Sequence, residues 1–545
     1  MAPIDWSVLS GPRVSRRTLF AVATASGAMS YAKRLGTVDA APAPRITPSG
    51  RLLAQGEPKP GGTLQLGFGI SQIPNLDPAK VNLGIVAGEI LPNIFSSLVQ
   101  FDENLGLVPD LAETWEVGED GLTYTFKLRD GLTFHNGDPL KAEDILFTYE
   151  RTTDPDFASP HANKLALVES VDTPDDLTVT FNLSAPFAPF LAVACSRGPG
   201  RAMTPVSRRA FEEMGEEQFD RTPVGAGPFM IVADTADLSS GFELAAFDGW
   251  YGGRPLLDSI QVTIIAEPSS RISALEAGDV DMLDIVPPTG VAQLAENPDF
   301  TLVQMPGTSW QGLAMNYQRP PWDNPEARMA VAKAIDRQAL IDTAFFGLWT
   351  PSIGAIAPAF SWAYIPPDQT ETPQGFNLDE AKALAESAGI TGAAPVIMGT
   401  SDTARGDEVL RNQLLELGLD VQIETLQQAA WNERWLAGDY DWIQNGSVAD
   451  ADPDDGHWNF FYSEGPWNSF KYNNPKVDEL LEATRATSDQ EERADLFHQV
   501  QSIVQQDATY AFLFHTLDIT GFSTDVQGYQ PIPELRHMET VWLDR

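Results

Sequence analysis

The sequence predicts a mixed α/β protein of two or three domains, and two observations support this fold class. From Gly61 onward, short apolar runs with β-leaning composition alternate with Pro/Gly/Asp turns and with amphipathic helical stretches. The chain has 545 residues, about three times a typical domain length, and 43% of them are hydrophobic. It therefore has enough apolar material for more than one core.

The strand candidates are short runs rich in β-branched and aromatic side chains, and turn residues bound most of them. Two longer apolar segments, 299–318 and 509–520, carry few helix signals. We expect each of these to be an extended strand that carries the chain from one lobe to another. The remaining strands are expected at 63–68, 123–128, 178–183, 229–233, 260–265 and 421–424.

The helix candidates carry apolar residues at i, i+3 and i+4, the spacing of one buried helix face. The proline-rich stretch 350–376 lacks this pattern and is expected to be an extended surface segment. We expect helices at 142–151, 269–277, 325–344, 378–388, 407–417, 428–437, 476–486 and 490–506.

The first 56 residues differ from the rest because they hold seven basic residues and only two acidic ones. Arg16 and Arg17 precede a mildly apolar stretch of 15 residues, 18–32, which resembles a twin-arginine export signal. A membrane-spanning helix needs about 20 strongly apolar residues, so this stretch predicts export without a permanent anchor. Cleavage is expected after Ala40 or Ala54, and no cysteine lies nearby to carry a lipid. Residues 1–56 are thus predicted to be signal and linker, and the mature protein is expected to be periplasmic.

The charge balance and the cysteine count exclude several classes of protein. Asp and Glu outnumber Lys and Arg by 76 to 35, which gives a formal charge of -41 that repels nucleic acid and anionic lipid. We therefore expect no nucleic-acid partner. The one cysteine, Cys195, can form no intramolecular disulfide and is expected to be a small buried apolar residue.

No catalytic or metal-binding pattern stands out. The six histidines lack HExxH or HxH spacing, and the region 307–312 is one residue too long for a GxSxG nucleophile turn. The acidic run 450–456 begins like an EF-hand loop but has Asp455 at the glycine position and Phe461 at the glutamate position. We expect no catalytic residue, no metal and no cofactor, so the chain is predicted not to be an enzyme. Capture of a solute in a cleft between lobes fits this profile, and a secreted hydrolase is a distant alternative.

Several motifs follow one another in a recognisable order, and the most specific of them fill 120–131, 134–139 and 142–151. With them the chain resembles the extracellular solute-binding proteins, family 5, of ABC transporters, the oligopeptide/dipeptide-binding type. The other matching motifs are 61–64, 76–78, 107–115, 223–229, 250–255, 274–281 and 330–337.

The resemblance implies an α/β fold of the periplasmic-binding-protein-like type II (cluster C), with two main lobes, an inserted extra domain and a ligand cleft between the lobes. A discontinuous lobe I would comprise 57–103, 222–309 and 514–545. The inserted lobe II would comprise 104–221, and lobe III 310–513. The resemblance also implies an ABC permease in the membrane as partner, and a monomer is expected.

In peptide binders of this family, an aspartate that ends a Trp-x-Ala-Asp stretch pairs with the cargo's α-ammonium. The resemblance places Asp450 in this role, and the alternative for Asp450 is a turn or N-cap aspartate. This sequence has Ser447 where the stretch has tryptophan, and Gln428 where an upstream aromatic is common. These departures suit a more polar cargo, so a sugar or another amine-bearing solute is the alternative to a short peptide. Weaker candidates for the binding site, by position, are Trp431, Trp310, Asn316 and Ser71.

Overall fold

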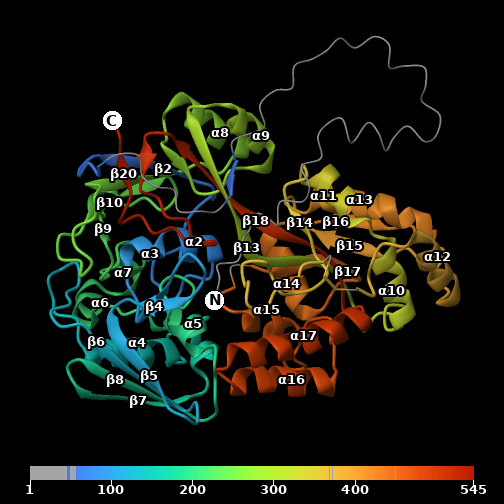
Figure 1. Cartoon of the computed structure of the whole chain (residues 1–545), viewed down its shortest axis with the longest axis horizontal. Helices are drawn as coiled ribbons and strands as arrows, with labels where there is room; N and C mark the ends of the chain where they lie inside the picture. Colours follow the sequence, from blue (N-terminus) through green and yellow to red (C-terminus); the bar gives the residue numbers. More distant parts are fainter. Residues whose placement is uncertain (1–45, 49–56, 368, 371, 449) are drawn as a thin grey trace. The chain divides into compact units, whose positions relative to one another are not determined.

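The computed structural model describes residues 46–48, 57–367, 369–370, 372–448 and 450–545. Its largest sheet is built on two long strands, β13 (Phe300–Met315) and β18 (Tyr510–Ser523), which lie side by side and antiparallel (Figure 1). Both strands are buried along most of their length, which explains why their sequences are apolar without strict alternation. Their extended conformation confirms the prediction made for 299–318 and 509–520.

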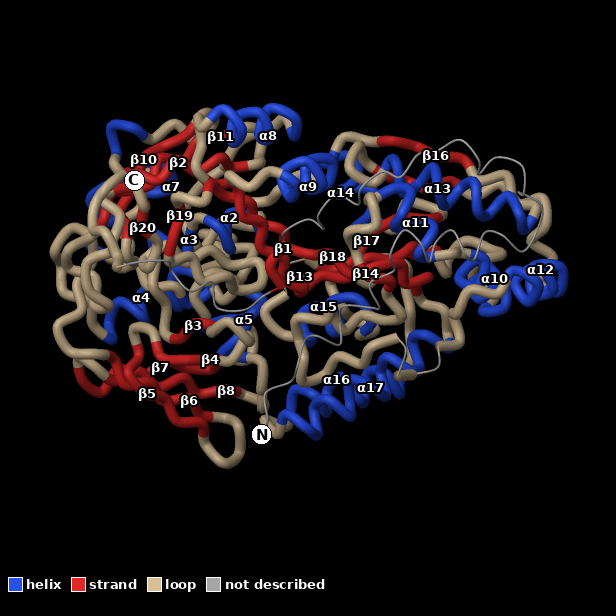
Figure 2. Tube along the Cα trace, turned by 45° about the horizontal axis from the view of Figure 1, so that its top comes forward, coloured by secondary structure: helices blue, strands red, loops and turns tan. Residues whose placement is uncertain are grey.

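The other strands of this sheet flank the central pair on both sides (Figure 2). On one side β17 (Trp442–Ser447) pairs with β13, followed by β15 (Val396–Gly399) and β16 (Gln422–Thr425). On the other side, next to β18, the strands follow in the order β12 (Met282–Leu283), β2 (Thr63–Phe68), β11 (Ser259–Ile264), β10 (Gly241–Ala246) and β9 (Phe229–Ile231). Two short strands add to the central pair: β1 (Ile46–Pro48) pairs with β13, and β14 (Thr350–Pro351) pairs with β18.

A bulge interrupts the pairing of β13 with β18 between Pro306 and Trp310. Pro306 has no amide N–H to donate to the ladder. Gly307 lies so close to β18 that an added Cβ would be 2.8 Å from Thr516 Oγ1. The bulge turns the backbone of Thr308 and Ser309 out of the regular ladder, and this is where the candidate site begins.

A separate antiparallel sheet has the strand order β5 (Ala112–Val117), β6 (Thr123–Leu128), β8 (Thr178–Leu183), β7 (Val168–Asp175). Alternate residues of β6 and β8 are buried, as expected for a sheet with one covered face. Phe126 and Phe181 meet there with ring centroids 5.7 Å apart, and α4 (Ala142–Thr153) packs on β7 and β8. The pair β3 (Val99–Phe101) and β4 (Leu107–Pro109) leads into this sheet.

The helices pack against these sheets, and polar caps start several of them. Asn474 and Asp489 accept backbone N–H bonds at the starts of α16 (Pro475–Ala486) and α17 (Gln490–Gln506), which pack on each other. Two short strands, β19 (Val526–Gln527) and β20 (Trp542–Leu543), pair near the C-terminus. The other α-helices of the described residues are α2 (Gly84–Glu89), α3 (Leu91–Ile94), α5 (Phe190–Cys195), α6 (Arg208–Met214), α7 (Glu216–Arg221), α8 (Pro268–Ala277), α9 (Pro288–Glu296), α10 (Pro325–Ala334), α11 (Arg337–Ala344), α12 (Leu378–Ser387), α13 (Ala404–Leu414), α14 (Gln428–Ala437) and α15 (Pro453–Phe461).

The local predictions succeed where the periodic pattern is long and bounded by turn residues. β2, β6, β8, α14 and α17 begin and end at the predicted residues. The prediction of one helix over 325–344 is wrong, because Ile335 is extended and Asp336 caps a second helix by accepting a bond from Ala339 N. The short helices α2, α3 and α5 were not predicted, since they are buried almost all round and carry no amphipathic pattern.

The described residues form one compact unit with several apolar cores, and Cys195 is buried in one of them as predicted. The predicted export segment lies outside the described residues except for β1. In the part of the chain that the structure describes, no helix combines the length and apolar character needed to cross a membrane. The boundaries given above for the three lobes stay a prediction.

Candidate functional site

A small cavity of about 20 Å³, room for about one water molecule, lies beside Asp450. Residues far apart in the sequence line it. Leu105 and Arg201 come from the region predicted as lobe II, and Thr308 from the β13 bulge. Glu534 comes from the C-terminal region. Parts of the chain separated by more than 400 residues therefore meet at one polar cavity.

Asp450 lies between β17 and α15, and its side chain is buried. It does not cap α15, because Asp452 accepts the Asp454 N–H bond at that helix end, at 2.9 Å. Burial raises the pKa of Asp450 well above its ordinary value, the negative charge of Asp455 adds to this rise, and the nearby Ser447 hydroxyl opposes only part of it. A buried carboxyl group of this kind favours a state in which a positive charge or a proton neutralises it.

Trp310 and Ser447 meet Asp450 around Gly456. The two residues face each other in the pairing of β13 with β17. A Cβ added to Gly456 would lie 2.6 Å from Asp450 Oδ2, 2.9 Å from Trp310 Nε1 and 3.2 Å from Ser447 Oγ. Among the described atoms, neither the Trp310 indole N–H nor the Ser447 hydroxyl makes a hydrogen bond of good geometry. The missing side chain at position 456 therefore leaves room for these three polar groups to converge.

Two basic side chains face the acidic ones. Arg201 Nε donates to the Val81 carbonyl at 2.7 Å, and Lys164 Nζ donates to the Pro199 carbonyl at 3.4 Å. Burial lowers the pKa of Arg201 to about 10, and it also lowers the pKa of Lys164. Asp455 lies within electrostatic range of both cations and partly offsets this effect.

Glu534 is a second carboxylate at the cavity. Its Oε1 accepts bonds from Thr308 N at 2.8 Å and from Ser309 Oγ at 3.0 Å. Its own N–H donates to Asp518 Oδ2 at 3.0 Å, and its φ of 57° is left-handed. Burial raises the pKa of Glu534, and the charge of Asp518 adds to the rise. Backbone and side-chain bonds thus hold the carboxylate toward the β13 bulge.

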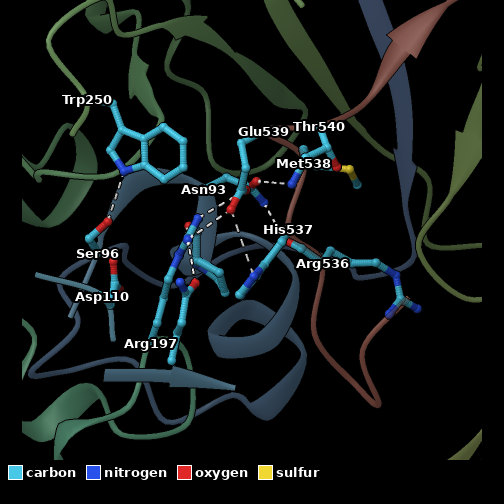
Figure 3. A network of polar contacts seen from close by, with 12 residues as sticks. Asn93, Ser96, Asp110, Arg197, Trp250, Arg536, His537, Met538, Glu539 and Thr540 are labelled. Carbon is cyan, nitrogen blue, oxygen red and sulfur yellow. Dashed lines mark hydrogen bonds and ion pairs between the residues drawn. The ribbon is translucent and has the colours of Figure 1, made fainter. Parts of the chain in front are cut away.

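A buried polar network fixes the segment that follows Glu534 (Figure 3). Glu539 pairs with Arg197, with Nη1–Oε1 and Nη2–Oε2 distances of 3.1 and 3.3 Å. Asn93 Nδ2 donates to the Arg536 carbonyl at 2.9 Å, and Asn93 Oδ1 accepts from Met538 N at 3.1 Å. Burial alone would raise the pKa of Glu539, but Arg197 holds it below its ordinary value. The C-terminal segment is therefore clamped to α3 and to the region before Arg201.

Of the site residues proposed from the sequence, Trp310 and Ser447 lie with Asp450, and the other four lie elsewhere. Trp431 packs in an aromatic core and donates its indole N–H to the Met398 carbonyl at 3.2 Å. Asn316 is buried and donates to the carbonyls of Gly438 and Tyr440, both at 2.9 Å. Gln428 and Ser71 are exposed and do not line the cavity, and Gln428 bonds to Asn432 within α14.

Sequence reasoning missed Thr308, Arg201 and Glu534. The Pro306–Gly307 pair inside an apolar run was a usable signal for the bulge that places Thr308 at the cavity. No local signal marks Arg201 or Glu534, because an isolated charge in a loop is ordinary. Within the described residues, no group of three or more His, Cys, Asp or Glu side chains is arranged to hold a metal ion.

The comparisons with known proteins fit this arrangement. A profile described as bacterial extracellular solute-binding proteins, family 5 Middle, matches residues 106–469, well over half of the chain. The chain belongs to this family. The dipeptide-binding protein of Escherichia coli (strain K12) is 27% identical to it, over 82% of this chain and 88% of that protein.

Solved structures of solute-binding proteins also match this chain over most of its length. The periplasmic binding protein DppA of Helicobacter pylori, in complex with the peptide STSA, matches with a TM-score of 0.77 and 27% identity, over 89% of this chain and 99% of that one. AgaA of A. tumefaciens R10, in complex with agropinic acid, matches with a TM-score of 0.76 and 25% identity, over 89% and 99%. These matches confirm the predicted family and the type II periplasmic-binding-protein fold.

Proposed function

We propose that this protein is the exported substrate-binding component of an ABC importer and that its cargo is a short peptide. The observation that carries the proposal is the buried carboxylate of Asp450, which lines a cavity shared by distant parts of the chain and forms no ion pair among the described residues. A peptide's α-ammonium would supply the missing charge through a charge-assisted hydrogen bond. The relatives named for dipeptide binding and the STSA complex support the same cargo class.

Hinge closure is the proposed mechanism. A cavity of about 20 Å³ cannot admit a peptide, so cargo must enter while the lobes are apart. β13 and β18 would act as the two crossing segments between lobe I and lobe III. Cargo that contacts both lobes binds the closed form more tightly than the open form, and it thereby shifts the equilibrium between the two forms toward closure.

A contact between the predicted lobes II and III supports closure. The Ala188 N–H donates to the Arg485 carbonyl at 2.8 Å. The Arg485 guanidinium lies 3.3 Å from the centre of the Trp458 ring and 5.0 Å from that of Phe187. Arg485 also binds Asp454 with two bonds of 2.7 and 2.8 Å. Only Ala188 and Phe187 belong to the predicted lobe II, so their two contacts with Arg485 would form as the inserted lobe meets α16, while Asp454 and Trp458 hold the Arg485 side chain within lobe III.

The first test is calorimetric titration of the purified protein with dipeptides, with recovery of the ligand afterwards. We expect saturable binding and chemically unchanged ligand, because binding needs no covalent step. Asp450→Asn should cost roughly 2 to 5 kcal/mol of affinity. Asp420→Asn, at an exposed position, is the control and should bind as the wild type does. Recovery of cleaved peptide would favour the hydrolase alternative, and binding of a sugar or polar amine alone would favour the other cargo class.

Export is proposed to use the twin-arginine pathway, without a lipid anchor. Replacing Arg16 and Arg17 together by lysine tests this, because the pathway reads the arginine pair. We expect the precursor to accumulate inside the cell while the folded protein is unchanged. Normal export of the double variant would contradict the assignment.

A further inference from the structure

The cavity holds more negative than positive charge. Two carboxylates, Asp450 and Glu534, line it, against one guanidinium, Arg201. Just behind the lining, Lys164 and Asp455 lie within electrostatic range of Asp450 and offset each other. One negative charge is therefore left over when all of these groups are ionised.

Two other buried aspartates in this protein are neutralised by arginine. Asp77 binds Arg151 with two bonds of 2.6 and 2.9 Å, and Asp452 binds Arg493 with two bonds of 2.7 and 3.0 Å. Within the described residues, neither Asp450 nor Glu534 has a basic side chain within 4.0 Å. Asp77 and Asp452 thus have arginine partners, whereas the two acids at the cavity have none among the described residues.

Arg536, two residues after Glu534, is already engaged by other acids. Arg536 donates to both oxygens of Asp518, at 3.0 and 2.7 Å, and its Nε lies 3.2 Å from Glu89 Oε2. Two acids therefore share this one guanidinium. Asp518 in turn faces Glu534 and raises its pKa further. Arg536 is therefore not available to neutralise Glu534.

A zwitterionic dipeptide would leave this imbalance unchanged. Its ammonium would meet Asp450 and its carboxylate would need Arg201 or Lys164, so Glu534 would stay uncompensated in a closed cavity. Burying an unpaired carboxylate is costly unless a cation or a proton neutralises it. A cargo with one further positive charge would remove the cost.

We infer that Glu534 is a second cation-recognising group, and that the preferred cargo is a short peptide with a net positive charge, such as one with a lysine or arginine side chain. This rests on the proposed function of the same cavity. Thr308 N and Ser309 Oγ orient the carboxylate, and the clamped 536–539 segment keeps it in place. Glu534 would thereby select cargo with an additional positive charge, while Asp450 binds the ammonium group of every amine-bearing cargo.

The experiment is titration calorimetry with Ala-Ala, Ala-Lys, Lys-Ala and 1,5-diaminopentane. We expect at least one lysine peptide to bind about tenfold or more tightly than Ala-Ala. Glu534→Gln should remove this preference, so that the lysine peptide and Ala-Ala bind the variant with similar affinity. Glu103→Gln is the matched control, because Glu103 is exposed near Leu105 and does not line the cavity. The melting temperature of each variant shows whether it is folded.

A second measurement needs no variant. Titration of the wild type in buffers of different ionisation enthalpy gives the number of protons taken up on binding. Binding of Ala-Ala should be accompanied by uptake of roughly one proton more than binding of the preferred lysine peptide. With Ala-Ala bound, a proton must neutralise Glu534, whereas the lysine side chain does so in the other complex.

The outcomes separate the two proposals. Equal affinities and equal proton uptake for all the peptides overturn the role of Glu534 and leave peptide binding standing. Binding of diaminopentane alone, lost in Glu534→Gln, supports the cation site and overturns the peptide cargo. Absence of binding by every compound overturns both.

Discussion

Asp407 on α13 provides a test of the electrostatics of this fold. Its side chain is fully buried; Oδ2 accepts a bond from Thr403 Oγ1 at 2.7 Å, and Oδ1 has no hydrogen-bond partner among the described atoms. Burial raises the pKa of Asp407 to about 7, and Thr403 opposes only part of this rise. The folded protein therefore holds a proton that the unfolded chain releases at a much lower pH.

The sign and the size of the effect follow from linkage. A carboxyl group whose pKa is raised in the folded state stabilises folding below its unfolded pKa of 3.8, and this stability is lost as the pH rises through about 7. Each pH unit in that interval costs about 1.4 kcal/mol, so the full loss is of the order of 4 kcal/mol. In Asp407→Asn the group does not titrate, and this loss should disappear.

Urea unfolding of wild type and Asp407→Asn across this pH range is the assay. The free energy of unfolding of the wild type, relative to the variant, should fall by about 4 kcal/mol between about pH 4 and pH 8. Asp402→Asn, at an exposed position on the same turn, is the control for the loss of one charge. Parallel pH profiles for wild type and Asp407→Asn would refute the reasoning, whatever their offset.

Three further outcomes are expected. Gly456→Ala should weaken cargo binding at least about tenfold in calorimetry, because its Cβ would press on Asp450 Oδ2; unchanged affinity would mean that Asp450 can move aside. Arg493→Met should cost about 3 to 5 kcal/mol in urea unfolding, because it leaves buried Asp452 unpaired, and adding Asp452→Asn should recover part of the loss. Arg485→Ala keeps the backbone bond to Ala188 but removes the side-chain contact with Phe187, so the scattering profile of the loaded protein should shift toward the open form; an unchanged profile would remove the Phe187 contact from closure.

Much of this protein could be predicted from local sequence. β6 and β8 alternate apolar and polar residues between turn signals, and α17 carries a long apolar stripe behind an Asp489 cap, so neighbouring residues alone define these elements. The ordered motifs were also sufficient to identify the family. The break between α10 and α11 was beyond such reasoning, because the apolar pattern runs through Ile335 and only the Asp336 cap distinguishes two helices from one.

The candidate site is different. Asp450 and Ser447 could be proposed from the sequence because a family motif marks their positions, and Trp310 could be proposed only from its position near the first crossing segment. Glu534 and Arg201 could not, since their importance depends on which charges surround them after folding and on which arginines are already paired. Pairing between chain segments hundreds of residues apart decides this, so the sequence alone determined the fold class and one acidic group of the cavity, and only the tertiary structure decided its charge balance.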